Sequence, residues 1–202
     1  MMAGQRSMAT VAKLPIINPH SAAASQPTKA GSRAPNRRNS VRMSSKPSQI
    51  AGIMAPETIM ELSSLVLACA IKAATAYGLP PTGIIAILEA EGGRIGEVSE
   101  NANGTRDIGP MQVNSLWLEP LARKWGVTPD EAEAALRDRP CTNIAVGSYI
   151  LADCIHKRGG DFWAGVGCYH APSDPERARA YADRVAGKAA ERFGLEVFRP
   201  ER

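Results

Sequence analysis

Two carboxylic acids, Glu91 and Asp107, stand 16 residues apart near the middle of the chain. At 100° per residue, a helix over 83–91 places Glu91 on the same apolar stripe as Leu88, whereas Glu89 falls on the opposite side. Burial disfavours a charged carboxylate, and so does the negative end of the helix dipole. We therefore expect a raised pKa for Glu91, which suits a proton donor to a leaving group. The alternative is a solvent-exposed side chain at a frayed helix end.

Asp107 lies just past a predicted hairpin turn. Two carboxylates on opposite walls of a cleft are the minimal apparatus for cutting a glycosidic bond, so Asp107 is a possible second carboxylate. It could equally be a turn residue that accepts hydrogen bonds from backbone amides. The chain offers no serine or cysteine nucleophile triad, and the glycine-rich segment 92–96 lacks the strand and the lysine of a phosphate loop. Glycoside cleavage is therefore the chemistry that these residues favour.

The elements that must position these acids are mainly helical. Apolar residues recur at steps of three and four and predict helices over 56–77, 83–91, 115–125, 129–138, 142–157, 161–170 and 175–193. Thr82 is expected to cap the second helix, and Thr128, in a capping box, the fourth. The dipeptide Asn103-Gly104 predicts a small β-hairpin within 101–112. The expected fold class is mainly α (α+β), with about seven helices and one hairpin.

The charge is unevenly distributed along the chain. Eight of the 24 Lys and Arg residues, and none of the 20 acids, lie in 1–54, which leaves 16 basic against 20 acidic residues in the remainder. This basic segment has no hydrophobic periodicity. We therefore expect a disordered basic arm over 1–55, a folded domain over 56–195 and a short tail over 196–202. A mildly acidic domain argues against nucleic acid as a partner. No stretch of 18 apolar residues is free of charge, which argues against a transmembrane segment.

Four cysteines, Cys69, Cys141, Cys154 and Cys168, form no CxxC pair, and no histidine stands at zinc-ligand spacing. We expect no metal site and no cofactor. An even number of cysteines allows two disulfides, which would imply an oxidising compartment, or four buried thiols in a cytosolic protein. Composition leaves both open, and no segment gives a convincing export signal.

Four blocks of the chain form a distinctive pattern. The first two, 90–93 and 103–115, contain a Glu that closes a helix and a later Gly-x-Met-Gln turn. The third, 140–151, begins Pro-Cys-Thr-Asn-Ile, and the fourth, 165–170, ends in Tyr-His. In this order and spacing, over about 125 residues, the blocks resemble the lysozyme-like and soluble lytic transglycosylase superfamily, which has Tyr-Asn in the fourth block. Among subfamilies, the chain is most similar to the small transglycosylases of conjugative type IV secretion and their invasion-associated relatives.

The resemblance implies a lysozyme-like domain and a role for individual residues. Glu91 matches the catalytic Glu, and Tyr169 matches an active-site Tyr that hydrogen-bonds near that Glu. Gln112 matches a Gln that lines the glycan cleft. The residues expected to bind substrate are Met111, Gln112, Asn114, Tyr169 and His170.

The resemblance also implies a disulfide between Cys69 and Cys141, a pair that some of these relatives join. The chain departs from the superfamily pattern at two places. His170 replaces the usual Asn, and the Glu-Thr dipeptide that precedes the last-helix Tyr is absent before Tyr181.

The implied reaction is cleavage of the β-1,4 bond between N-acetylmuramic acid and N-acetylglucosamine in peptidoglycan, with closure of the 6-hydroxyl onto C1. The implied place is the bacterial periplasm or cell envelope, and the implied partners are glycan strands and proteins of a secretion or conjugation apparatus. Asp107 also resembles the second carboxylate of animal-type lysozymes, in which a Glu of raised pKa acts beside an ionised Asp. A hydrolase, and a non-catalytic assembly component that binds glycan, therefore stay open as alternatives.

Overall fold

The computed structural model describes residues 56–194, with side chains from Ser64 onward. This part confirms the expected mainly-α fold with a small β element. Its helices are α1 (Pro56–Tyr77), α2 (Pro81–Glu91), α3 (Leu118–Trp125), α4 (Pro129–Asp138), α5 (Pro140–Lys157), α6 (Phe162–His170) and α7 (Pro175–Phe193). Its strands are β1 (Val98–Glu100), β2 (Arg106–Ile108) and β3 (Val113–Asn114). The basic arm and the tail expected at 1–55 and 196–202 lie outside the described residues.

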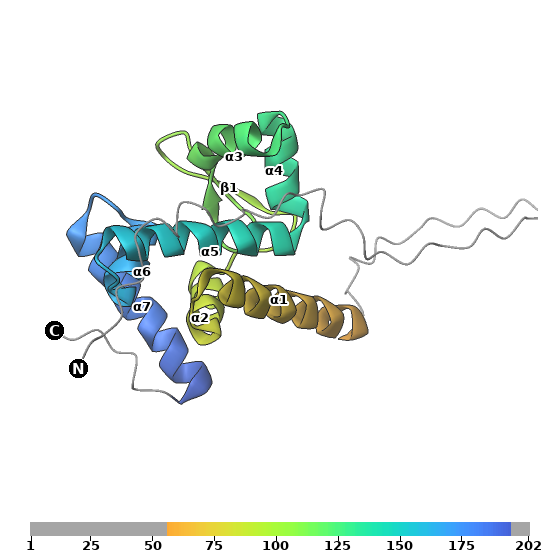
Figure 1. Ribbon diagram of the computed structural model, residues 1–202. Coiled ribbons are helices and arrows are strands. Elements are labelled where there is room, and N and C mark those ends of the chain that lie inside the picture. Colours follow the sequence, from red (N-terminus) through yellow and green to blue (C-terminus); the bar gives the residue numbers. More distant parts are fainter. Residues whose placement is uncertain (1–55, 195–202) are drawn as a thin grey trace, which may run out of the picture.

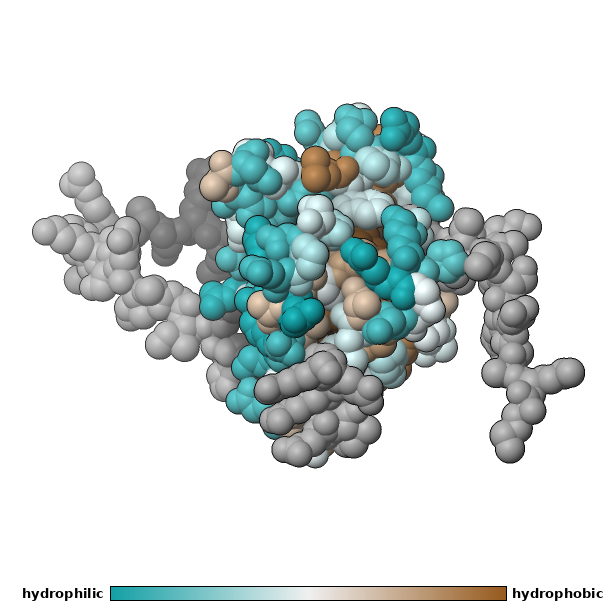
Figure 2. All heavy atoms as spheres, turned by 90° about the vertical axis from the view of Figure 1, so that its left-hand side faces the viewer, coloured by the Kyte–Doolittle hydropathy of each residue, from teal (hydrophilic) through white to brown (hydrophobic). Residues whose placement is uncertain are grey.

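Helix α5 forms the centre of the domain (Figure 1). Helices α1 and α2 lie on one side of α5, the sheet lies with α3 and α4 on the other, and α6 and α7 close one end. Ile144, Val146 and Leu151 of α5 have no exposed surface, because helices cover α5 on several sides. At the α6 and α7 end, hydrophilic side chains surround a smaller central area of apolar ones (Figure 2).

Three helix starts differ from those expected by two residues or more. Helix α2 begins at Pro81, and the residue before it makes no side-chain cap, so Thr82 is not the cap. Proline has no backbone N–H to satisfy and its fixed φ suits the first turn, so Pro81 and Pro140 open α2 and α5 two residues early. The expected third helix is divided into a 3-10 turn over Ser115–Trp117 and then α3. The capping box of Thr128 is confirmed.

The β element is larger than a hairpin. Strand β2 pairs antiparallel with β1 on one side and with β3 on the other. The turn between β1 and β2 carries the predicted Asn103-Gly104 dipeptide, with Gly104 at φ 81°. Asp107 lies opposite Ser99 in one register and opposite Asn114 in the other. The second candidate carboxylate therefore stands in the central strand, with neighbours on both sides.

Two disulfides tie the ends of α5 to neighbouring helices. Cys69 of α1 bonds to Cys141 at the start of α5, with a Cα–Cα distance of 4.9 Å, and Cys154 bonds to Cys168 of α6, at 5.7 Å. The first pair is the one that the resemblance implied. The second pair follows from the crossing of α5 and α6, which the sequence left open.

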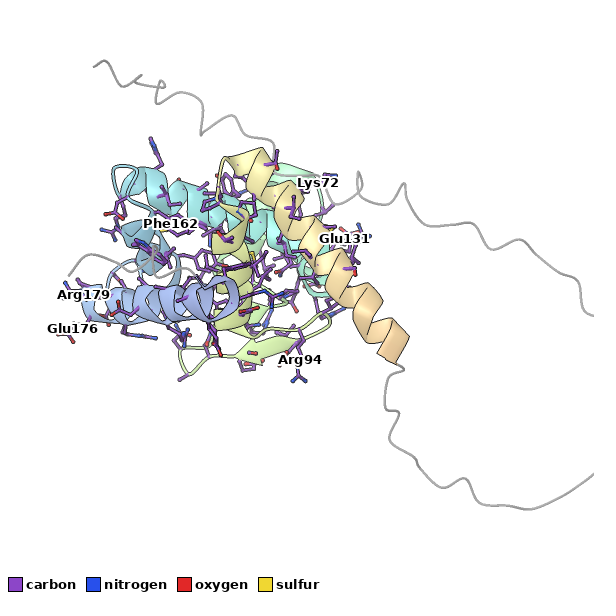
Figure 3. All side chains as sticks on the ribbon, turned by 90° about the horizontal axis from the view of Figure 1, so that it is seen from below. Lys72, Arg94, Glu131, Phe162, Glu176 and Arg179 are labelled. Atoms are coloured by element: carbon purple, nitrogen blue, oxygen red, sulfur yellow. A yellow bond between two sulfur atoms is a disulfide. The ribbon has the colours of Figure 1, made fainter. Side chains whose placement is uncertain are left out.

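Charged side chains point away from the domain, and an aromatic side chain packs inside it. Lys72, Arg94 and Arg179 point outward, whereas Phe162 lies within the packing at the start of α6 (Figure 3). A Cβ atom at Gly83 would lie 2.6 Å from the Phe162 ring, so glycine at this position lets α6 pack directly on α2. Among the helices of residues 56–194, none has the length and apolarity needed to cross a membrane.

Candidate active site

Glu91 is the last residue of α2 and is half-buried. Gly92 follows in the left-handed conformation, φ 66°, and its N–H bonds back to the Leu88 carbonyl, which ends the helix directly after Glu91. A Cβ atom at Gly93 would lie 2.2 Å from the Gly109 carbonyl oxygen, so only glycine fits there. The two glycines thus bring the end of α2 against the turn between β2 and β3.

Tyr181 of α7 is the direct partner of Glu91. Its hydroxyl donates a 2.5 Å hydrogen bond to Glu91 Oε1, and its side chain is only 2% exposed. Burial first, and then the nearby Glu91 carboxyl, raise the pKa of Tyr181 far above its ordinary value, so the phenol remains a hydrogen-bond donor. Tyr181 is absent from the residues expected to form the site. Its only signal in the sequence is its place in the last helix, beside the missing Glu-Thr dipeptide.

The pKa of Glu91 is raised above its ordinary value, as expected. Burial is the largest cause, and the charge of Asp107 adds to it. The hydrogen bond from Tyr181 and the positive charge of Arg184 act in the opposite direction. A carboxyl group with a raised pKa keeps its proton closer to neutral pH, which is the property that a general acid needs.

Asp107 is held by two amide side chains. Its Oδ2 accepts a 2.9 Å hydrogen bond from Asn101, and its Oδ1 accepts a 2.8 Å hydrogen bond from Asn114. Both amides also donate to the hydroxyl of Thr105. The charge of Asp107 acts on Glu91, so the fold brings the two predicted carboxylates into electrostatic contact. Both oxygens of Asp107 have protein donors.

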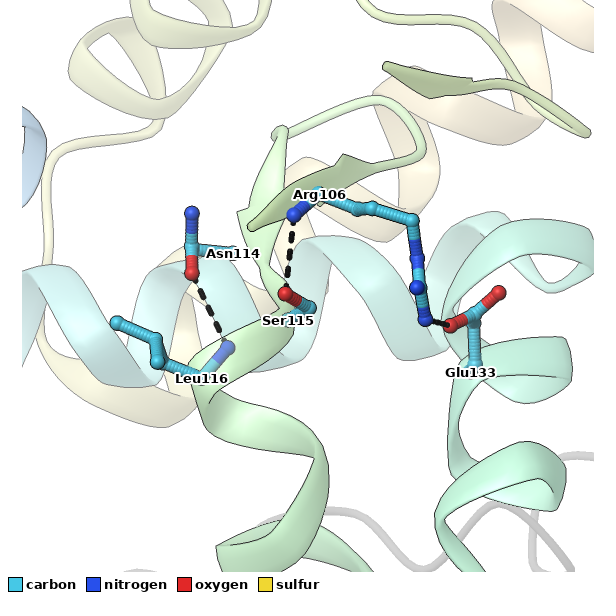
Figure 4. Close-up of polar contacts among 5 residues, drawn as sticks. All are labelled: Arg106, Asn114, Ser115, Leu116 and Glu133. Carbon is cyan, nitrogen blue, oxygen red and sulfur yellow. Dashed lines mark hydrogen bonds and ion pairs between the residues drawn. The ribbon is translucent and has the colours of Figure 1, made fainter. Parts of the chain in front are cut away.

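Asn114 uses its side chain within the protein. Besides donating to Asp107, it accepts a 3.0 Å hydrogen bond from the Leu116 N–H and so caps the 3-10 turn (Figure 4). Nearby, the Ser115 hydroxyl accepts from the Arg106 N–H at 2.9 Å, and the Arg106 guanidinium pairs with Glu133 of α4. These contacts make Asn114 a residue that positions Asp107, and the substrate contact expected of it stays a prediction.

Met111 is expected from the sequence to bind substrate, but its side chain is fully buried and has no surface to offer a substrate. Its sulfur packs where a Cβ atom on Gly147 of α5 would otherwise stand, at 2.6 Å. Its backbone is held on both sides, because its N–H donates to Asn143 Oδ1 at 2.8 Å and its carbonyl accepts from the Tyr169 hydroxyl at 2.6 Å. Met111 therefore anchors the turn to the core.

Asn143, a fully buried polar residue of α5, fixes the same turn. Its amide donates to the carbonyls of Ile108 and Leu136 at 2.7 and 3.1 Å, while its oxygen accepts from Met111. Buried polar side chains are retained where their hydrogen bonds are satisfied. The Pro-Cys-Thr-Asn block of the sequence contained this residue, but only the tertiary structure reveals which carbonyls it holds.

Gln112 has φ 46°, the one positive φ of a non-glycine residue within 56–194. Such a conformation costs on the order of 1–3 kcal/mol and persists only where the surroundings impose it. Its amide nitrogen donates to the Gly109 carbonyl at 2.9 Å and lies where a Cβ atom of Gly93 would come within 2.6 Å. Gln112 therefore lies beside the end of α2 that carries Glu91.

Tyr169 and His170, adjacent on α6, take different places. The Tyr169 hydroxyl bonds to the Met111 carbonyl, and the hydrogen bond to Glu91 itself comes from Tyr181. Burial first, and then the charges of Glu91 and Asp107, raise the pKa of Tyr169, which places it in the same neighbourhood. His170 stacks in parallel on Tyr181, with ring centroids 4.3 Å apart.

A separate pocket of about 730 Å³ lies between α6 and the first turns of α7. It is lined by neither Glu91 nor Asp107, and its one carboxylate, Asp161, caps α6 by accepting from the Ala164 N–H. This pocket is therefore not the candidate catalytic site, although it is large enough to hold a ligand. Within residues 64–194, no three His, Cys, Asp or Glu side chains are grouped to hold a metal ion.

Comparisons with known proteins show what the chain is similar to. A family model described as a transglycosylase SLT domain matches residues 68–190. The chain is 31% identical over 121 residues to invasion protein IagB of Salmonella typhimurium (strain SL1344), covering 58% of this chain and 72% of IagB. It is 30% identical over 112 residues to protein IpgF of Shigella flexneri, covering 55% of this chain and 70% of IpgF. A peptidoglycan-binding-like protein of Escherichia coli O157:H7 is 33% identical over 119 residues, covering 56% and 69% of the two chains.

Proposed function

The chain belongs to the transglycosylase SLT domain family, and from that membership we propose that it cleaves the β-1,4 bond between N-acetylmuramic acid and N-acetylglucosamine. The product would be a 1,6-anhydro-N-acetylmuramic acid end. Membership confirms the resemblance found in the sequence and gives the chain a lytic transglycosylase-like function related to peptidoglycan. The observation that carries the reaction is a half-buried Glu91 whose pKa is raised and whose Oε1 is held by Tyr181.

In the proposed reaction, Glu91 first donates its proton to the glycosidic oxygen, and the bond from that oxygen to C1 breaks. The sugar then carries the positive charge of an oxocarbenium-like state. Next, the 6-hydroxyl oxygen of the same sugar bonds to C1 and gives its proton to the Glu91 carboxylate. The acid is thereby regenerated without water, redox change or an enzyme nucleophile.

The other residues around Glu91 support this proposal in different ways. Tyr181 keeps the carboxyl in one orientation through its hydrogen bond. Gln112 is the proposed glycan contact, because it lies beside the end of α2. Tyr169 and Asn143 hold the backbone of the Met111 turn and therefore act through its position.

A lysozyme-type hydrolase is the second candidate, and the charge of Asp107 acting on Glu91 favours it. Retaining hydrolases place their second carboxylate about 5 Å from the acid and use it as a nucleophile. The two asparagine donors on Asp107 instead favour a fixed electrostatic role. The third candidate is a non-catalytic component that binds glycan.

The proposal extends to location and partners. Two disulfides are typical of an oxidising compartment, which supports the bacterial periplasm or cell envelope. IagB is named an invasion protein, and we propose by analogy that this chain opens the wall locally for a secretion or conjugation apparatus. Glycan strands are the proposed substrate, and proteins of that apparatus are the proposed partners.

The test is product analysis by mass spectrometry after incubation of the full chain with purified sacculi. Anhydro-muramic ends are expected from the wild-type chain. If the wild-type chain instead releases fragments with reducing ends, and the Asp107→Asn variant does not, the protein is a hydrolase and the transglycosylase proposal is wrong. Binding to sacculi without any release of fragments would favour the non-catalytic component.

A further inference from the structure

His170 and Tyr181 form a parallel stack between the end of α6 and the middle of α7. Their ring centroids are 4.3 Å apart and their planes differ by 4°. The Arg184 guanidinium carbon also lies 5.0 Å from the centroid of the Tyr181 ring. Stacked rings at this separation attract each other, and a cation near an aromatic face adds to the attraction. The Tyr181 ring is therefore held by contacts from two helices.

The position of that ring decides the geometry at Glu91. A tyrosine hydroxyl has no freedom of its own apart from rotation of its proton, so its place follows from the two side-chain torsions. The Tyr181 hydroxyl lies 2.5 Å from Glu91 Oε1, which leaves little tolerance for a shift of the ring. Whatever fixes the ring also fixes the orientation of the carboxyl.

The surface exposure of His170 and Tyr181 also indicates that the imidazole holds the phenol ring in place. His170 is itself exposed, whereas Tyr181 beneath it is only 2% exposed. The imidazole thus covers the phenol from the solvent side. Removal of the imidazole would admit water to the face of a ring whose hydroxyl bonds to the acid.

We propose that His170 is a positioning residue, which holds Tyr181 by stacking and so keeps the Glu91 carboxyl in the orientation that donates its proton. This inference rests on the proposed function of Glu91. It replaces the role in substrate binding expected for His170 from the sequence.

The charges around His170 add a pH dependence. Burial of the stacked face first, then Arg184 and Arg177 of α7, lower the pKa of His170, while Asp107 of β2 opposes them. Tyr181, which stacks on His170, and Glu91, which accepts from Tyr181, are further titratable groups on this side, together with Tyr169. Near neutral pH the imidazole is uncharged. As the pH falls through its lowered pKa, a third positive charge appears beside the two arginines, so the stack and the activity that depends on it change with pH.

The test compares the wild-type full chain with His170→Ala, His170→Phe and a control, His156→Ala, which removes an exposed histidine of α5. Activity on sacculi is measured as kcat and KM across pH. We expect His170→Ala to lower kcat about tenfold with KM unchanged, since an aromatic pair contributes energy on that scale. His170→Phe should retain kcat within about threefold, since the stack is kept. It should also lose the acid-side inflection that belongs to His170. His156→Ala should match the wild type.

A second measurement does not depend on activity. The carboxyl carbon of Glu91 is titrated by NMR in protein labelled with ¹³C-glutamate and assigned with Glu91→Gln. His170→Ala should shift the pKa of Glu91, because both the hydrogen bond from Tyr181, which lowers it, and the burial that raises it depend on the position of the Tyr181 ring, and His170→Phe should leave it unchanged. An unchanged titration in His170→Ala would overturn the inference, as would a rise in KM of equal size in both variants. If the titration shifts as expected but the wild-type chain releases no glycan, positioning stands and the proposed function fails.

Discussion

The phenolic oxygen of Tyr181 lies 2.5 Å from Oε1 of Glu91, although 90 residues separate the two in the sequence. The contact exists because α7 packs against α2 along the lower side of α5. Burial raises the pKa of Glu91, and the Tyr181 hydroxyl partly offsets that rise. The balance of these two effects sets the pH range in which Glu91 can donate a proton.

Glu91→Gln tests the general acid. The substitution preserves the shape of the side chain and its place on α2 but removes the donated proton. We expect the rate on sacculi to fall at least about a hundredfold, the usual scale for general acid–base catalysis. Glu89→Gln is the matched control, because Glu89 lies on the outer side of the same helix and pairs with Arg192. Equal losses in both variants would contradict the assignment.

Tyr181→Phe tests the orientation and the pKa of Glu91. Without the hydroxyl, the pKa of Glu91 rises further, because the hydrogen bond lowers it. Activity that needs protonated Glu91 is lost as the pH rises through that pKa, so the alkaline limb of the pH–kcat profile should move to higher pH. Tyr169→Phe serves as the comparison, since its hydroxyl bonds to the Met111 carbonyl. A shift of the same size in both variants would argue against the contact.

Gly93→Ala tests the close approach of α2 to the turn. Its Cβ atom would lie 2.2 Å from the Gly109 carbonyl oxygen, so the turn and Gln112 must move. We expect a lower melting temperature and loss of activity. Gly187→Ala in α7 is the control, because nothing lies within 4 Å of its added Cβ atom. That change should stabilise the protein by up to about 1 kcal/mol, the helix preference of alanine over glycine. Similar melting temperatures in the two variants would contradict the packing.

Replacement of both Cys69 and Cys141 by alanine tests the longer disulfide. The bond joins residues 72 positions apart, so the chain-entropy model gives a loss of about 4 kcal/mol in the free energy of unfolding. The disulfide between Cys154 and Cys168 joins residues only 14 positions apart. Replacement of both cysteines should therefore lower the free energy of unfolding by about 3 kcal/mol. Urea unfolding measures both losses. Peptide mapping without reductant, in protein isolated from the cell envelope, checks the pairing, and free thiols there would count against both bonds.

Removal of residues 1–55 tests the boundary predicted from charge and hydropathy. A chain that starts at Pro56 should fold and digest sacculi as well as the full chain at high salt. At low salt the full chain should be favoured, because its eight basic residues attract anionic envelope polymers and the Debye length grows to roughly 10 Å at 0.1 M. If the shorter chain is inactive at both salt concentrations, the predicted boundary is wrong.

The sequence determined the features that depend on neighbours along the chain. The periodicity of apolar residues gave the number and order of the helices, and the capping box at Thr128 gave the start of α4. Asn103-Gly104 marked the turn between β1 and β2. The place of Glu91 on the apolar stripe predicted its partial burial and raised pKa. Each of these follows from local backbone preferences and from which side of an element is apolar.

Only the tertiary structure decided which residues meet. Tyr181 became the partner of Glu91, Met111 entered the core, and Asn114 became a support for Asp107. A polar or sulfur-containing side chain near a turn is compatible with either a substrate surface or an internal contact. Which of the two applies depends on how helices that are distant in sequence cross. Here α5 and α7 supply the atoms that make the internal contacts of Met111 and Glu91. Local sequence carries no record of those crossings, because the contact energies arise only when the chain is folded.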